Sequence, residues 1–356
     1  MSRGSCARRA VGREVRGGAL LRWRPAGALQ LARAVRRWGA TAAAACEAAA
    51  LAFPERTAIL DDHAAFTFAQ LNERSAALSG ALQQRGVGPG STIAVRAGNH
   101  HWLVETLIAA ARVQANVALL DPRSDAHHLS RIASREHLRA LILDPEPSGA
   151  RRGPVMFAAG AGPACPPARL DELIDGAAAQ PAGVKGEIAA HVILSEPSPQ
   201  GGWLYHRRPA TLTAPSAHRA IPLRPRQRTM ICAPLCSRWG HFHLMLGLRF
   251  GSTLVLSEQF DPLHALAALA EHRVSVLALR AEMLAAIVGL PAATLSWYPT
   301  PELRVIALGG PSLPGEVAIP AMRHFGPVLY TRRGPAMITL QSLSLARHLE
   351  GSVAAA

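Results

Sequence analysis

The chain has 356 residues, 49% of them hydrophobic and 17% charged, which is ample apolar material for the cores of about two domains. Its five cysteines are odd in number and scattered, which argues against a disulfide framework and favours a reducing compartment. No apolar run reaches the roughly 18 residues of a membrane-spanning helix, so we expect a cytoplasmic protein.

Arginine supplies almost all of the positive charge behind the formal net charge of +14, since Lys185 is the only lysine. A basic balance of this kind suits nucleic acid, an anionic membrane or an acidic small molecule. The preference for arginine over lysine also follows from genome composition, which we favour as its cause. We expect no specific nucleic-acid partner, and the oligomeric state stays open.

Residues 1–48 form a basic segment, rich in alanine and arginine, that is predicted to be helical. Within it, apolar residues recur at helical spacing at Ala28, Leu31, Val35 and Trp38. One interpretation is weak peripheral attachment to an acidic membrane, and another is an organellar transit peptide. We favour a third, a helix packed on the protein body with its arginines in water, because the apolar stripe is narrow.

Residues 49–187 are predicted to form an α/β subdomain, and residues 49–145 a compact unit with parallel strands. Thr67 and Gln70 make a capping box that starts a helix, and Gly86 ends it. The proline- and glycine-rich residues 145–187 are predicted to be a surface excursion. Helices and strands alternate before it, with strands at Thr92–Val95, Val117–Leu120 and Ala140–Leu143 and helices near Trp102–Val113 and Asp125–Arg135.

Residues 188–335 are predicted to form a second α/β subdomain, and residues 336–356 a tail. Asp261 and Pro262 are a good helix start, with aspartate as N-cap and proline in the first turn. The predicted fold class is α/β, with layered, doubly wound subdomains. Strands are expected at Met230–Ala233, Thr253–Leu256, Val274–Leu279, Val305–Leu308 and Val328–Tyr330.

The stretch Val192–Pro209 begins with a strand, continues into a loop rich in serine, proline and glycine, and then enters a basic turn. A strand followed by such a loop commonly cradles phosphate, because consecutive backbone N–H groups close around an anion. Trp203 and Tyr205 beside the arginines of this turn also suit single-stranded nucleic acid. We favour aromatic rings that simply fill space.

Soft metal ligands fall within a short span at Cys232, Cys236, His241 and His243. Zinc sites usually use tighter pairs such as Cys-x₂-Cys, and buried cysteine is commonly part of a core, so we predict no metal site. Adjacent histidines point to different sides of a helix. We therefore interpret two such pairs as surface histidines, His100–His101 and His127–His128.

Five segments, in the correct order, carry a family resemblance: FPERTAILDDHAAFTFAQLNERSAALSGALQQRGVGPG, GNHHWLVETLIAAARVQANVALLDP, APLCSRWGHFHLMLGLRFGSTLVLSEQFDP, LRVIALGGPSLPGE and VLYTRRG. Over Phe53–Gly334 the chain resembles the bacterial long-chain fatty-acid–CoA ligases of the adenylate-forming, or AMP-binding, superfamily. The resemblance implies their N-terminal region of α/β subdomains, with the C-terminal domain and its adenylation lysine missing. It also implies ATP, Mg²⁺ and CoA as cofactors and a fatty acid or acyl-CoA as ligand.

The resemblance places a degenerate phosphate loop on this chain. Where the family carries T-S-G-T-T-G-x-P-K-G, Trp203 stands at the lysine, and Glu196, Pro197, Pro199 and Gln200 stand at Ser, Gly, Thr and Gly. Proline has no N–H to offer a phosphate. The remnant loop therefore consists of Ser195 and Ser198 at two of the threonines, together with Gly201, Gly202, Arg207 and Arg208.

On the adenine side the resemblance places Gly309, Gly310 and Pro311, and Gly334 is the one match to the family's Y-G-x-T-E motif. Met337 replaces the Mg²⁺-binding glutamate of that motif, and Ala336 its threonine. Ser237 stands where the family often has an acyl-pocket histidine. The resemblance thus leaves no catalytic residue intact and no metal ligand.

We expect an acyl-CoA-synthetase-like protein with reduced or no activity. Its ancestral reaction is ATP-dependent activation of a fatty acid to acyl-AMP and then to acyl-CoA. Two alternatives stay open. One is a non-catalytic protein that binds nucleotide or acyl-CoA, or that pairs with an intact paralogue. The other is a gene remnant. The sequence does not determine the acyl chain length.

Overall fold

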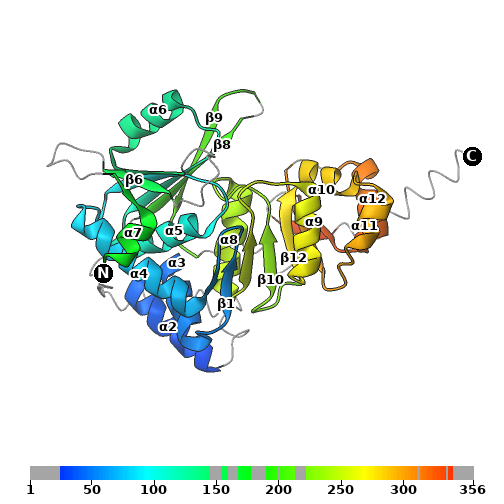
Figure 1. The fold of residues 1–356 in the computed structure, drawn as a ribbon, viewed down its shortest axis with the longest axis horizontal. Helices are drawn as coiled ribbons and strands as arrows, with labels where there is room; N and C mark the ends of the chain where they lie inside the picture. Colours follow the sequence, from blue (N-terminus) through cyan, green and yellow to red (C-terminus); the bar gives the residue numbers. More distant parts are fainter. Residues whose placement is uncertain are drawn as a thin grey trace, which may run out of the picture.

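The computed structural model describes residues 25–144, 154–158, 167–177, 190–198, 200–212, 222–310, 313–333 and 336–339. Two sheets organise them, one of seven strands and one of eight. Helices lie between the sheets and on both outer sides (Figure 1). The layered α/β class expected from the sequence is confirmed.

The seven-stranded sheet has the order β7-β6-β5-β3-β4-β8-β9. Strands β5, β3, β4 and β8 run parallel, and antiparallel strands extend the sheet on both edges. The hairpin of β8 and β9 forms one of these edges. The strands are β3 (Thr92–Arg96), β4 (Asn116–Leu120), β5 (Leu138–Leu143), β6 (Val155–Ala158), β7 (Ala168–Arg169), β8 (His191–Pro197) and β9 (Trp203–Pro209).

The eight-stranded sheet has the order β15-β14-β13-β12-β10-β11-β1-β2 and is parallel from β14 to β1. Its two outermost strands, β2 and β15, are antiparallel. The strands are β1 (Thr57–Leu60), β2 (Ala65–Thr67), β10 (Arg228–Ile231), β11 (Thr253–Leu256), β12 (Val276–Arg280), β13 (Val305–Gly309), β14 (Leu329–Arg333) and β15 (Ala336–Thr339).

The sheets do not follow the division expected at residue 187. Strands β1 and β2 come early in the chain but join the eight-stranded sheet through β11, and β8 and β9 come late but join the seven-stranded sheet through β4. Residues 49–145 are therefore not one compact unit, although β3, β4 and β5 are parallel as expected. β15 also lies in the segment predicted to be a tail. Local patterns do not encode these partners, because strand pairing between distant segments depends on which faces the helices cover.

Helices fill three layers around the two sheets (Figure 1). α6 covers the outer face of the seven-stranded sheet, α9, α10 and α12 cover the outer face of the eight-stranded sheet, and α2 to α5 and α8 pack in the core between them. The helices are α2 (Pro25–Trp38), α3 (Ala42–Ala52), α4 (Phe68–Gln84), α5 (His101–Val113), α6 (Ala126–Glu136), α7 (Leu170–Asp175), α8 (Arg238–Phe250), α9 (Pro262–Glu271), α10 (Ala281–Val288), α11 (Ala292–Trp297) and α12 (Gly315–Phe325).

Local signals placed several helix ends correctly. The Thr67 side chain accepts from the Gln70 N–H at 3.2 Å and the Gln70 side chain accepts from the Thr67 N–H at 2.8 Å, which is the expected capping box. Gly86 follows α4 with φ of 73°, a conformation that favours glycine. Asp261 caps α9 by accepting from the His264 N–H at 2.7 Å.

The interpretation of the paired histidines as surface residues is wrong for three of the four. His100, His101 and His128 are 1%, 2% and 1% exposed. Each has a hydrogen-bonding partner that offsets the cost of burial: Asp144 for His100 at 2.8 Å, Asp61 for His101 at 2.7 Å and Ser195 for His128 at 2.9 Å.

The apolar stripe of α2 packs inside the protein. Leu31, Val35 and Trp38 are at most 3% exposed and belong to the core between the sheets, while Arg33 and Arg36 are exposed. This is the packed helix with solvated arginines that the narrow stripe favoured. Within the described residues no helix has the length and apolar character needed to span a bilayer.

Candidate functional site

The remnant phosphate loop is a tight turn that uses its own backbone donors. The Ser198 N–H donates to the Gly202 carbonyl at 3.0 Å, the Gly201 N–H to the Ser198 carbonyl at 3.1 Å, and the Gln200 N–H to the Ser198 hydroxyl at 3.2 Å. Gly201 and Gly202, with φ of 90° and 77°, allow the reversal. These three N–H groups are paired within the turn and are not presented to an anion.

The hydroxyl of Ser195 is also in use. Ser195 on β8 is fully buried, and its Oγ lies 2.9 Å from Nε2 of His128, whose Nδ1 lies 3.0 Å from the Tyr205 hydroxyl. Asp125, the N-cap of α6, accepts from the His128 N–H at 2.7 Å and holds this first turn in place. Burial lowers the pKa of His128, so its neutral ring donates to one hydroxyl and accepts from the other.

Trp203, at the position of the family's phosphate-binding lysine, packs on the same histidine. The ring centres of Trp203 and His128 are 4.2 Å apart, with 33° between the planes. The Tyr205 ring also stacks on His128, with ring centres 5.5 Å apart and 14° between the planes. The guanidinium of Arg135 lies 5.5 Å from the centre of the Tyr205 ring. An aromatic cluster between β9 and α6 thus occupies this part of the hairpin.

The structure separates the predicted arginines from the loop. The basic turn expected after the loop is strand β9, in which Arg207 and Arg208 pair with Ile193 and Val192 near the start of β8. Arg207 forms an ion pair with Glu136 of α6 at 3.1 Å. Successive side chains point to opposite faces of a strand. Arg207 and Arg208 are neighbours in the sequence but therefore lie on different faces of the sheet.

Gly309 ends β13, and a tryptophan covers it. A Cβ atom on Gly309 would lie 2.4 to 2.8 Å from atoms of the Trp239 ring, which leaves room for glycine alone. The Trp239 Nε1–H donates to the Ala307 carbonyl at 3.3 Å and holds the ring there. Gly310 follows with φ of 115°. Pro311 and Gly334 lie outside the described residues, so their adenine-side role stays a prediction.

Glu196 joins the two sheets at this edge, and sequence reasoning did not find its partners. Its carboxylate lies 3.2 Å from His206 Nε2 on β9, 3.4 Å from Arg238 Nε at the start of α8, and 3.8 Å from Arg280 Nη2 at the end of β12. Arg280 is also the register partner of Gly309. The carboxyl end of β8, which leads into the loop, therefore lies close to the carboxyl ends of β12 and β13. α/β proteins bind ligands at this end of their parallel strands.

A positional signal for these arginines was present in the sequence. Arg238 follows the helix N-cap Ser237, and Arg280 follows a buried run that ends at Leu279. Residues at the carboxyl end of a parallel strand or at a helix start are the ones that reach a shared edge. What the sequence lacked was the packing of the two sheets, which brings the carboxyl ends of β12 and β8 together.

The residues present do not suit Mg²⁺. Met337 lies in β15 at the position of the family's metal-binding glutamate, and a thioether is a poor ligand for a cation that requires oxygen. Among the described residues no group of three or more histidine, cysteine, aspartate or glutamate side chains is placed to hold a metal ion. Two of the soft metal ligands noted in the sequence, Cys232 and His241, are buried. Burial raises the pKa of the Cys232 thiol to about 12 and lowers the pKa of the His241 imidazole to about 4.

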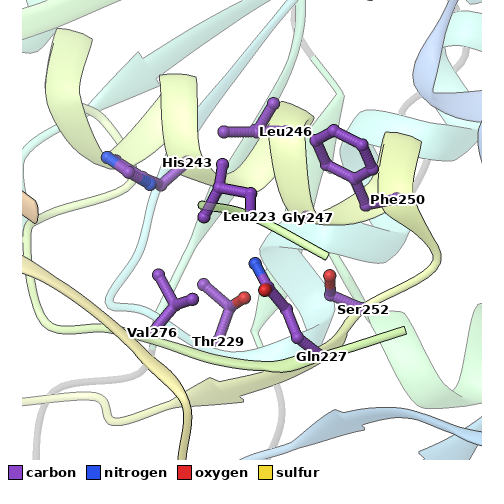
Figure 2. Close-up of a pocket in the computed structure, with 9 residues that line it drawn as sticks. All are labelled: Leu223, Gln227, Thr229, His243, Leu246, Gly247, Phe250, Ser252 and Val276. Carbon is purple, nitrogen blue, oxygen red and sulfur yellow. The ribbon is translucent and has the colours of Figure 1, made fainter. Parts of the chain in front are cut away.

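A small pocket lies beneath α8, lined in part by His243, Ser252 and Thr229 (Figure 2). The His243 Nε2 and Ser252 Oγ atoms are buried, and neither has a hydrogen-bond partner among the described residues. The space suits about one water molecule. We therefore assign it no role in binding a nucleotide or an acyl chain.

The sequence model of the AMP-binding enzyme family matches this chain over residues 46–193 and 195–335. The chain belongs to the AMP-binding enzyme family. This match covers both sheets apart from β15, and it includes the hairpin of β8 and β9. The suspected relation to acyl-CoA synthetases is therefore confirmed at the level of the family.

Among relatives of the family, a feruloyl-CoA synthase from an Amycolatopsis species is 28% identical over 271 residues. That alignment covers 74% of this chain and 53% of the relative, so the chain spans about half the length of the curated relative it matches.

Two solved structures share the fold. The inhibitor-bound N-terminal domain of FACL13 from Mycobacterium tuberculosis has a TM-score of 0.68 at 19% identity, with 82% of this chain and 74% of that domain covered. O-succinylbenzoate coenzyme A synthetase from Bacillus subtilis, in complex with AMP, has a TM-score of 0.63 at 19% identity, covering 82% of this chain and 73% of that one. The shared region confirms the acyl-CoA-synthetase-like N-terminal fold.

Proposed function

We propose that this chain is an AMP-binding-family protein in which ATP-dependent activation of a carboxylic acid is reduced or absent. One observation carries the proposal: the loop that would hold the phosphates closes on itself through hydrogen bonds of its own N–H groups at Ser198, Gln200 and Gly201. An N–H group already paired within a tight turn must break that bond before it stabilises a phosphate oxygen.

Side chains around the loop support the same proposal. The Ser195 hydroxyl is held by His128, and Trp203 replaces a cation with an indole ring. Phosphoryl chemistry depends on donors and cations that are positioned before the reaction. Loss of one such donor costs about 3–4 kcal/mol, or 10²–10³ in rate, and several losses that act together remove most of the acceleration, although not additively.

The reaction at issue has two steps in the family. A carboxylate attacks the α-phosphate of ATP and releases pyrophosphate, and the thiol of CoA then displaces AMP from the acyl-AMP. ATP and CoA remain the cofactors that membership of the family suggests for the ancestral protein. Mg²⁺ supplies charge neutralisation when it is bound in the family, but the side chains at its position here do not fit it.

A pyrophosphate–ATP exchange assay tests the proposal. We expect the purified chain, with ATP, Mg²⁺ and either palmitate or ferulate, to give no exchange above a heat-inactivated sample. Exchange above that background with either acid would overturn the proposal. Arg207→Ala, compared with the exposed control Arg273→Ala, would then show whether a hairpin arginine supplies the missing charge.

A second candidate is a non-catalytic protein that binds an acidic ligand such as a nucleotide or an acyl-CoA. It is favoured by the two arginines, from α8 and β12, that lie with His206 of β9 around Glu196. Equilibrium binding of AMP or acyl-CoA without pyrophosphate exchange would support this candidate. Binding of neither ligand would exclude it.

A further inference from the structure

Three arginines gather where the parallel strands of the eight-stranded sheet begin. Arg56 immediately precedes β1, and Arg228 is the first residue of β10. Strand β11 joins these two strands, since Arg228 pairs with Thr253 and the Thr253 hydroxyl donates to the Thr57 carbonyl at 2.7 Å. Arg226 belongs to the same group, because the Arg56 guanidinium donates to its backbone carbonyl. This edge is opposite to the carboxyl ends of the strands, where the candidate site lies.

Acidic side chains do not balance the charge of this group. Among the described residues none of the three arginines forms an ion pair, whereas Arg273 at the same edge is paired with a glutamate at 2.8 Å. Glu55 precedes Arg56 in the chain but is exposed and makes no ion pair with it. Burial, together with the charges of Arg226 and Arg228, lowers the pKa of Arg56. The three positive charges therefore act on one another without a counter-ion from the protein.

Hydrogen bonds within the protein use only a few of the guanidinium donors. Arg56 and Arg228 each donate to a backbone carbonyl, in the case of Arg228 that of His272 at 2.7 Å, and a carbonyl carries no net charge. The Arg56 Nε atom is buried without a hydrogen-bond partner among the described residues, which adds to the cost of holding this charge. Arg226 and Arg228 are exposed, so their planar sets of N–H donors are accessible to an anion from solution.

The number of arginines favours a phosphate group over a carboxylate. A phosphate monoester carries about 1.5–2 negative charges at neutral pH and three acceptor oxygens. Its oxygens point in different directions and reach more than one guanidinium group, whereas the two oxygens of a carboxylate match a single one. A dianion also offsets the mutual repulsion of several arginines better than a monoanion does.

We propose that Arg226 and Arg228 bind the phosphate group of a small molecule at the amino ends of β1 and β10, and that the more buried Arg56 adds positive charge to this site. The proposal does not depend on whether the chain binds ATP or catalyses adenylation, because the site lies at the opposite edge of the sheet from the candidate site.

Calorimetric titration of the full chain with inorganic phosphate at low salt tests the site. We expect saturable binding that Arg226→Asn weakens by about tenfold, because the substitution removes a charged hydrogen-bond donor. Asparagine tolerates the left-handed backbone at this position, where φ is 60°. Arg228→Gln should weaken binding to a similar extent. Acetate, which carries a single charge on a carboxylate, should bind more weakly than phosphate.

The matched control is Arg273→Gln, which removes an arginine that already has an acidic partner at the same edge and is expected to leave the affinity for phosphate unchanged. The proposal is overturned if phosphate does not bind, if Arg226→Asn and Arg228→Gln retain full affinity, or if Arg273→Gln weakens binding equally. Loss of binding in Arg280→Gln, with Arg226→Asn unaffected, would place the phosphate at the carboxyl ends of the strands and would also overturn it.

Two further results would contradict the proposal. Acetate binding as tight as that of phosphate would refute the assignment of the ligand class. Thermal unfolding without phosphate shows whether the variants fold, which we expect at these exposed positions. Failure of both Arg226→Asn and Arg228→Gln to unfold cooperatively would show that these arginines support the fold and do not serve a ligand.

Discussion

At the scale of single residues, burial sets the protonation of the histidines on α8. His241 and His243 are 8% and 1% exposed, and burial lowers their pKa values to about 4 and about 3. His243 lines the small pocket beneath the helix and has no hydrogen-bond partner among the described residues to stabilise a proton. Between about pH 3 and 6.5, His243 is therefore neutral in the folded state and protonated in the unfolded one.

This difference predicts an acid-sensitive fold. In the unfolded chain His243 titrates near its usual pKa of about 6.5, so the unfolded state binds more protons below that pH and stability falls as pH decreases toward the folded value of about 3. We expect His243→Gln to flatten the decline of the melting temperature between about pH 6.5 and 4. The control is His127→Gln, at an exposed position on α6. Equal slopes in the unaltered chain and His243→Gln would rule out this source of acid sensitivity.

At the scale of elements, one ion-pair network ties α4, α5 and α7 together. Arg74 on α4 contacts Glu105 on α5 at 2.5 Å and Asp171 on α7 at 2.7 Å, and Trp102 donates to Asp171 at 3.1 Å. Glu105 is fully buried, and burial raises its pKa. The arginine is what makes a carboxylate at this depth tolerable, since an unpaired buried charge is costly.

Truncation of this arginine should therefore cost far more than truncation of an exposed one. We expect Arg74→Ala to lower the free energy of unfolding by about 3–5 kcal/mol, because it leaves the Glu105 carboxylate buried without its partner. Arg273 makes a contact of the same kind with Glu302 at 2.8 Å, but its side chain is 72% exposed, so Arg273→Ala should cost about 1 kcal/mol or less. Urea unfolding measures both. Similar losses in the two variants would show that burial of Glu105 is not what matters.

At the scale of the whole molecule, charge and hydrophobicity are separated on the N-terminal helix. The apolar side of α2 is buried in the core between the sheets, and its arginines face water. An association with acidic membranes, which stays a proposal together with a cytoplasmic location, would then rest on charge and not on insertion of apolar side chains. Such binding is screened over a Debye length of about 10 Å at 0.1 M salt.

We expect weak binding to vesicles that contain anionic lipid, lost between low and high salt, and no binding to neutral vesicles. Arg33→Gln with Arg36→Gln should weaken it, whereas the control Arg273→Gln, on the distant surface before β12, should weaken it less. Vesicle sedimentation measures the bound fraction. Binding that resists high salt, or that the paired substitution leaves unchanged, would contradict attachment through α2.

The sequence by itself determined the local structure and the family. Caps at Thr67 and Asp261 and the apolar runs of the parallel strands act over short distances, and the structure confirms them. The order of the five family segments can be read directly from the chain, and the family match confirms it. Ser195 lies on a strand as expected, whereas Arg207 and Arg208 lie on β9 and not in a turn. The availability of these side chains was not predictable from their type. Whether a serine hydroxyl or a loop N–H is free depends on what lies beside it.

Only the tertiary structure decided which distant segments meet. It exchanged β1 and β8 between the expected subdomains, and it buried His128 against Ser195. It also brought Arg280 to Glu196 across the two sheets. The physical reason is common to all of these: a strand order and a buried polar contact result from matching whole surfaces, and partners that are 67 positions apart, as His128 and Ser195 are, leave no mark in the local pattern.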